Sequence, residues 1–128
     1  MKKFVYILAF LLMAAGMSSC NMKIENPTVK NLVGTWDLVS DTIISGTTET
    51  TTKATDGEYI VITETSFTRY SGNREVKSSF SFSNPHLFID GNNSYDLVSL
   101  THSEMVLSTN SLLISLLGAE HQYKYKRR

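Results

Sequence analysis

Hydrophobic and polar residues alternate along most of this chain, in short runs that are rich in Thr, Val, Ile, Tyr and Phe. In residues 76–83, Phe80 and Phe82 share one face while the serines beside them share the other. This period of two is typical of a β-sheet with one dry side. From Leu32 onward the pattern predicts strands at 34–40, 43–52, 58–63, 66–70, 76–83, 86–89, 94–100, 104–108 and 121–127.

Turn-forming residues stand between these runs at short and regular intervals. They are Asp56-Gly57, Ser71-Gly72-Asn73, Asn84-Pro85, Asp90-Gly91-Asn92 and Thr101-His102-Ser103. Short strands and turns at this spacing indicate an antiparallel meander that closes on itself. We therefore expect an all-β fold, a small antiparallel up-and-down β-barrel of about eight strands.

Residues 110–118 break the alternation. Asn110 or Ser111 can cap a short helix over 112–117, which Gly118 would end. An apolar strand or a loop tip explains the same residues, because the run is too short for its period to decide. We favour a short helix or an ordered loop, packed on one end of the barrel near the C-terminus.

The first nineteen residues have the three-part layout of a secretory signal. Lys2 and Lys3 precede an uncharged apolar run over 4–15, and small residues follow it. This run is shorter than the roughly 18 to 20 residues that a membrane-spanning helix needs. The segment Met17-Ser18-Ser19-Cys20 resembles the bacterial lipobox, with Met where Leu is most frequent. The resemblance implies cleavage before Cys20 and acylation of that residue, for example with palmitate, which would attach the chain to a lipid bilayer.

These features divide the chain into three parts. Residues 1–19 are the expected signal peptide, 20–31 a lipidated N-terminus with a flexible tether, and 32–128 one β-barrel domain. Cys20 is the only cysteine, so no intramolecular disulfide can form. Lipid attachment explains a single exported cysteine better than redox chemistry does. An ordinary signal peptide followed by a chance cysteine is the alternative.

Net charge argues against one class of partner. The full chain has twelve basic and twelve acidic residues, and removal of the signal takes away Lys2 and Lys3, which leaves the mature part slightly acidic. A nucleic-acid binder usually presents a basic face, so we expect no nucleic-acid partner. Asn21 is not the Asp that retains many enterobacterial lipoproteins in the inner membrane. The sequence therefore favours the outer membrane, without indicating the periplasmic or the surface face.

The first predicted strand begins with Gly34-Thr35-Trp36. Gly-x-Trp at this place resembles the lipocalin superfamily and, together with the lipobox, the lipocalin-like lipoproteins of Bacteroidetes. The likeness continues in residues 58–62, in 90–98, in 103–107 and in the last strand, 123–127. It implies that Trp36 packs across the barrel bottom and that Gly34 lets the chain bend into the strand, so both are structural residues. It also implies a membrane-anchored binding protein for a small apolar ligand.

Inward-facing aromatic residues would line the interior of a ligand-binding barrel. The candidates are Tyr59, Phe67, Phe80, Phe82, Phe88, Tyr95, Tyr123 and Tyr125. The same side chains can fill a small eight-stranded barrel that has no cavity. The second hypothesis is therefore a structural or protein-interaction lipoprotein of the cell envelope, which docks a partner through its outer face or through residues 112–117.

No residue pattern indicates catalysis. His86, His102 and His121 stand singly, without the spacing of metal ligands. The chain has no Gly-x-Ser-x-Gly elbow, and its glycines are isolated rather than grouped in a phosphate-binding loop. Four carboxylates are better interpreted as solvated surface charges than as acid–base pairs: Asp56, Glu64, Asp90 and Asp96. We expect no enzyme, no cofactor and no metal.

One further segment suggests a modification. Asp41-Thr42-Ile43 resembles the Asp-Ser/Thr-aliphatic acceptor motif for O-glycosylation of exported Bacteroidetes proteins. The resemblance makes Thr42 a candidate glycan attachment site, and a polar residue at a strand edge is the alternative. The threonine-rich residues 47–52 that follow indicate an exposed strand or hairpin tip.

Overall fold

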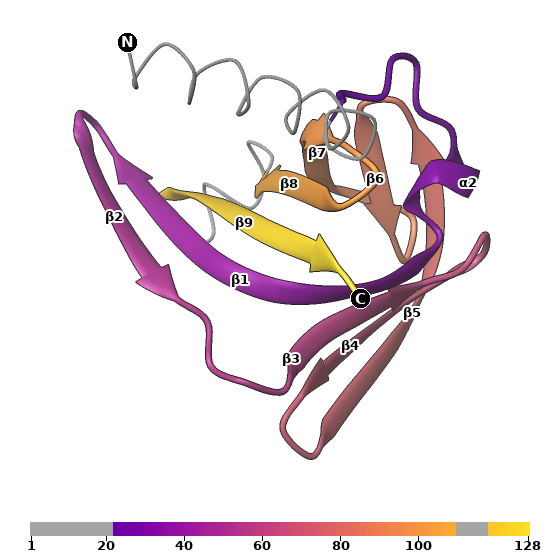
Figure 1. Ribbon diagram of the computed structural model, residues 1–128, viewed down its shortest axis with the longest axis horizontal. Coiled ribbons are helices and arrows are strands. Elements are labelled where there is room, and N and C mark those ends of the chain that lie inside the picture. The colour runs from indigo at the N-terminus through magenta and orange to yellow at the C-terminus, as the bar shows by residue number, and fades with distance from the viewer. Residues whose placement is uncertain (1–21, 110–117) are drawn as a thin grey trace, which may run out of the picture.

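The alternating runs form nine antiparallel strands in the computed structural model, which describes residues 22–109 and 118–128. Their order in the sheet is β2-β1-β3-β4-β5-β6-β7-β8-β9, and β1 also pairs with β9, which closes the sheet (Figure 1). The predicted antiparallel barrel of eight strands is confirmed, with β2 lying outside the ring. The strands are β1 (Gly34–Ser45), β2 (Thr48–Lys53), β3 (Glu58–Ile62), β4 (Ser66–Ser71), β5 (Arg74–Ser83), β6 (His86–Ile89), β7 (Asn92–Leu100), β8 (Glu104–Thr109) and β9 (Glu120–Arg127).

β1 is longer than the sequence predicts because it pairs with three strands. Its first part pairs with β3, its second part pairs with β2 along the same edge, and β9 runs along the other edge. The predicted break near residues 41–42 is wrong, since Asp41 and Thr42 both pair within the sheet. The hairpin turn follows Ser45 instead, where Gly46 adopts a left-handed conformation with φ of 62°.

The two ends of the barrel differ in character. We call one the closed end, where the short helix α2 (Val29–Leu32) lies beside the turns that follow β3, β5 and β7. We call the opposite end the mouth, where the turns that follow β2, β4 and β6 lie. The core between them consists of Leu32, Trp36, Ile60, Ile62, Phe67, Phe80, Leu87, Leu100, Met105, Leu107 and Tyr125.

Trp36 lies at the centre of the closed end. Its side chain is fully buried, and its indole Nε1 donates a hydrogen bond of 2.9 Å to the carbonyl oxygen of Leu32. The guanidinium of Arg127 lies over the indole ring, 4.1 Å from the ring centroid. A hydrogen-bonded tryptophan thus connects α2, the first strand and the last strand.

The guanidinium of Arg127 hydrogen-bonds to three backbone carbonyl oxygens at the closed end. Its Nε donates to the carbonyl oxygen of His102 at 2.7 Å, Nη1 to that of Val33 at 2.9 Å, and Nη2 to that of Asn31 at 2.9 Å. Gly34 makes room for it, because a Cβ at that position would lie 2.6 Å from Nη1. Gly34 also has a φ of 146°, which favours glycine.

Replacing Arg127 by lysine is expected to lower the free energy of unfolding by about 2 kcal/mol, because one ammonium group cannot reach three carbonyl oxygens at once. Urea titration followed by circular dichroism measures the loss. Arg128→Lys is the matched control, since Arg128 makes an exposed ion pair with Asp37, and its replacement is expected to leave the free energy of unfolding almost unchanged. Equal losses in the two variants would contradict this role for Arg127.

The N-terminal segment lies against the closed end. The amide of Ile24 donates a hydrogen bond of 2.8 Å to the carbonyl oxygen of Leu100, at the end of β7. Ile24 and Val29 pack against the core, and Leu32 is fully buried. This differs from a freely flexible tether, because burial of apolar side chains stabilises the contact. The chain is therefore held on the barrel from Ile24 onward.

Some of the sequence predictions concern other parts of the chain. The signal peptide, Cys20 and the apolar run 112–117 lie outside the described residues. Within the described ranges, no helix is both long enough and apolar enough to span a lipid bilayer.

Candidate binding site at the barrel mouth

Six of the eight aromatic residues that the sequence predicts to line the barrel interior do face it. Three belong to the buried core and three pack against it, and they come from β4, β5, β7 and β9. They are Phe67, Phe80, Tyr125, Phe82, Tyr95 and Tyr123.

Tyr59 and Phe88 do not line the barrel. Each alternates with a buried, inward-facing neighbour, Ile60 beside Tyr59 and Leu87 beside Phe88. Tyr59 stacks on Tyr70 instead, with 4.5 Å between the ring centroids. The strands that hold them, β3 and β6, carry apolar residues on both faces. The alternation in the sequence therefore does not reveal which face is inside.

The interior is filled at the closed end and hollow toward the mouth. Trp36 and Met105 are 0% exposed at the filled end. Beyond the core a hollow of about 200 Å³ opens between β4, β5, β6 and β7. Its apolar lining includes Phe67, Ile89 and Tyr95, and its polar lining includes Arg69, Ser78 and Ser94.

A second hollow of about 220 Å³ adjoins the first. It lies on the hairpin of β4 and β5, and its lining residues are Arg69, Ser71, Arg74 and Val76. The two hollows share Arg69 and Val76. Together they form one surface, which we call the mouth site, that changes from aromatic inside to cationic at its rim.

A row of rings extends from the mouth site across the barrel. Phe67 lies 6.4 Å from Tyr95, Tyr95 lies 6.1 Å from Tyr123, and Tyr123 stacks on His121 at 5.8 Å between centroids. Burial raises the pKa of Tyr95, and it raises the pKa of Tyr123 to about 12. Both phenols therefore stay protonated at neutral pH. Neither hydroxyl hydrogen-bonds to any residue in the described part of the chain, so both can donate to a ligand.

His121 and Asp41 form a pair at the end of this row. The Nδ1 atom of His121 lies 3.0 Å and 3.2 Å from the two carboxylate oxygens of Asp41. The carboxylate fixes the proton on Nδ1 and leaves Nε2 as an acceptor in the neutral ring. Eighty positions separate the two residues, and only the pairing of β1 with β9 brings them together. Sequence spacing could not reveal this pair.

The other candidate polar residues do not come together in the part of the chain that the structure describes. His86 bonds to Asp96 at 2.7 Å, on the strand face opposite the buried Leu87. The His102 carbonyl oxygen accepts from Arg127. The four carboxylates stay apart: Asp56 and Glu64 lie near opposite ends of the barrel, Asp90 accepts from the Ser79 amide, and Asp96 faces His86. Among the described residues no three His, Cys, Asp or Glu side chains are grouped to hold a metal ion.

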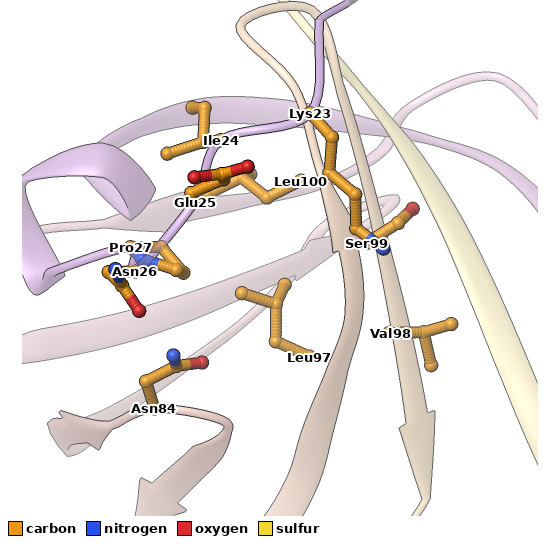
Figure 2. A pocket seen from close by; sticks show the side chains of 10 residues that line it. All are labelled: Lys23, Ile24, Glu25, Asn26, Pro27, Asn84, Leu97, Val98, Ser99 and Leu100. Atoms are coloured by element: carbon orange, nitrogen blue, oxygen red, sulfur yellow. The ribbon is translucent and has the colours of Figure 1, made fainter.

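A larger hollow of about 450 Å³ lies on the outside of the closed end. Figure 2 shows residues 23–27 of the N-terminal segment on one side of it and Leu97, Val98, Ser99 and Leu100 of β7 on another. None of the ten residues that line it is aromatic, and Lys23 and Glu25 carry opposite charges there. The mouth site combines apolar, aromatic and charged groups and is the better candidate for binding a small molecule.

Thr42, the candidate glycan site, lies on β1. Its hydroxyl hydrogen-bonds to the Thr51 hydroxyl of β2 at 2.9 Å, and its side chain is half-buried. A glycan on its oxygen would remove the Thr42 hydroxyl proton, so Thr51 would have to be the donor in this hydrogen bond.

Comparison of the chain with protein-family models, curated proteins and solved structures finds no match. The fold and the site together define a class, that of closed antiparallel barrels with a filled end and an aromatic, cationic mouth. The chemistry of the mouth site is therefore the main guide to function.

Proposed function

We propose that this chain is the precursor of a lipid-anchored envelope protein, similar to the lipocalin-like lipoproteins of Bacteroidetes, whose barrel binds a small, largely apolar molecule at its mouth. The signal layout and the lipobox-like segment ending in Cys20 support the anchor. The outer membrane is the favoured location. Binding is favoured over catalysis because no hydroxyl or thiol in residues 22–109 and 118–128 bonds to the ring of His121.

The observation that carries the proposal is the contrast between the two ends of the interior. A barrel that serves only as a structural unit gains stability by filling its interior throughout. Here the hollow of about 200 Å³ is left open beside Phe67, Ile89 and Tyr95. Ligand sites of proteins typically measure about 300 to 1,000 Å³, so this hollow takes one apolar end of a ligand, and the rest lies along the rim.

Filling the hollow tests the proposal. Ser78 faces the hollow from β5, and Ser78→Trp is expected to abolish ligand binding because the indole occupies the space that the ligand needs. The measurement is native mass spectrometry of the protein purified from cells without refolding, which detects a bound small molecule as added mass. The wild-type protein is expected to carry such a mass and the variant to lack it.

Ser81→Trp is the matched control. Ser81 is exposed and lies on the same strand, on the face opposite the buried Phe80. This control is expected to retain the bound mass. Wild-type protein without any bound species, both as isolated and after incubation with a lipid extract, would contradict the proposed function.

A further inference from the structure

Arg69 is a cation on the inner surface of a barrel. It follows the buried Phe67 by two positions on β4, so it faces the same side of the sheet one step nearer the mouth. It lines both hollows of the mouth site. Its positive charge acts across the interior. Burial raises the pKa of Tyr95 and of Tyr123, and the charge of Arg69 opposes part of that rise.

Arg69 has no carboxylate partner among the described residues. Over the described ranges it makes no hydrogen bond and no ion pair. Glu58, which lines a small hollow together with Arg69, instead accepts from the hydroxyls of Thr55 and Ser71, each at 3.3 Å. Arg69 is exposed to solvent at the mouth, so its charge is available to a ligand there.

Arg74 adds a second cation at the rim. It pairs with Ser71 across the hairpin of β4 and β5, and it lines the outer hollow together with Arg69. In the described part of the chain Arg74 also has no ion pair. Val76 lies on the same strand between the two hollows and is 53% exposed, which leaves an apolar side chain uncovered beside the two cations.

We infer that the mouth site selects small amphipathic molecules that carry a carboxylate or a phosphate group. The anionic group lies between Arg69 and Arg74, whose planar forks of donors match the oxygens of either group. The apolar part enters the hollow beside Phe67 and Tyr95. This inference rests on the proposed function and adds the charge of the ligand to it.

Two fluorescent probes with one skeleton separate charge from apolar contact. 8-Anilinonaphthalene-1-sulfonate carries a sulfonate, and N-phenyl-1-naphthylamine is the same ring system without it. The full mature protein is titrated with each probe. The anionic probe is expected to bind about tenfold more tightly, the preference expected from hydrogen bonds to a charged group. The preference is expected to fall as salt is added, because the rim is open to solvent.

Charge-removing variants assign the preference to the two arginines. Arg69→Gln and Arg74→Gln are each expected to reduce affinity for the anionic probe several-fold and to leave the neutral probe unchanged. Both side chains are exposed, and within residues 22–109 and 118–128 neither makes a hydrogen bond or an ion pair. Lys77→Gln is the control, because it removes the same charge from the exposed outer face of β5. It is expected to leave both affinities unchanged.

The outcomes separate this inference from the proposed function. Equal binding of the two probes to the wild type would overturn the anionic selection and leave the binding function in place. Failure of both probes to bind would overturn both proposals. A preference that survives Arg69→Gln and Arg74→Gln would refute the role of the arginines. Competition by octanoate or by octyl phosphate then distinguishes a carboxylate from a phosphate, and failure of both competitors would also overturn the inference.

Discussion

Replacement of Trp36 by alanine is expected to lower the free energy of unfolding by about 4 kcal/mol, the upper part of the range for large-to-small changes in a core. The indole is fully buried, donates to the carbonyl oxygen of Leu32 and lies under the guanidinium of Arg127. The variant loses apolar contact, one hydrogen bond and one cation–π contact together. Because whole domains are stable by only about 5 to 15 kcal/mol, the variant is expected to be partly unfolded at physiological temperature.

Equilibrium urea unfolding, followed by circular dichroism, measures this loss. Trp36→Phe keeps an aromatic ring but leaves the Leu32 carbonyl oxygen without its donor, so it is expected to cost about 2 kcal/mol. Val39→Ala is the control for side-chain truncation on the same strand, because Val39 is 36% exposed. Its expected cost is below about 1 kcal/mol. A Trp36→Ala variant as stable as Val39→Ala would show that the closed end is not held together by this residue.

Replacing Cys20 by serine is expected to abolish lipid attachment completely. The proposed modification requires a thiol, and removal of the signal follows attachment of the lipid. The variant is therefore expected to incorporate no radiolabelled palmitate and to keep its signal, which raises its mass on a denaturing gel. Its membrane association would then depend on the uncleaved apolar run alone, which has neither the length of a spanning helix nor an acyl chain.

Met17→Leu is the matched control for this experiment. It changes the segment before Cys20 toward the residue most frequent in lipoboxes and keeps the cysteine. It is expected to be labelled and cleaved at least as well as the wild type. Palmitate labelling that persists in Cys20→Ser would contradict the anchor. Normal cleavage without any label in the wild type would favour an ordinary signal peptide.

Local pattern was sufficient to predict most of the barrel. In β5 the phenylalanines and serines alternate cleanly, and the structure places Phe80 in the core while Ser81 is exposed. Turn residues such as Asp90-Gly91 end strands as expected, with φ of 53° and 81°. The pattern was misleading where polar residues lie within a strand. Asp41 lies in the polar stretch Ser40-Asp41-Thr42 of β1, yet it bonds to a histidine of β9 and the strand continues.

The mouth site was only partly predictable. Its two aromatic residues, Phe67 and Tyr95, were identified, because inward aromatic positions follow from alternation. Arg69 was missed, since a single arginine in a strand has no motif around it. Its spacing of two from Phe67 was the available signal. The pairing of Asp41 with His121 depends on the register of barrel closure, which no local pattern contains.

The contact between Ile24 and Leu100 determines how an acylated protein would stand on its bilayer. Four peptide units separate Cys20 from Ile24, and a fully extended chain of that length spans about 14 Å. A lipid on Cys20 would thus hold the closed end within a short distance of the headgroups. The mouth lies at the other end of the strands and would open toward the aqueous compartment. Ligands would then arrive from water rather than by lateral diffusion in the membrane.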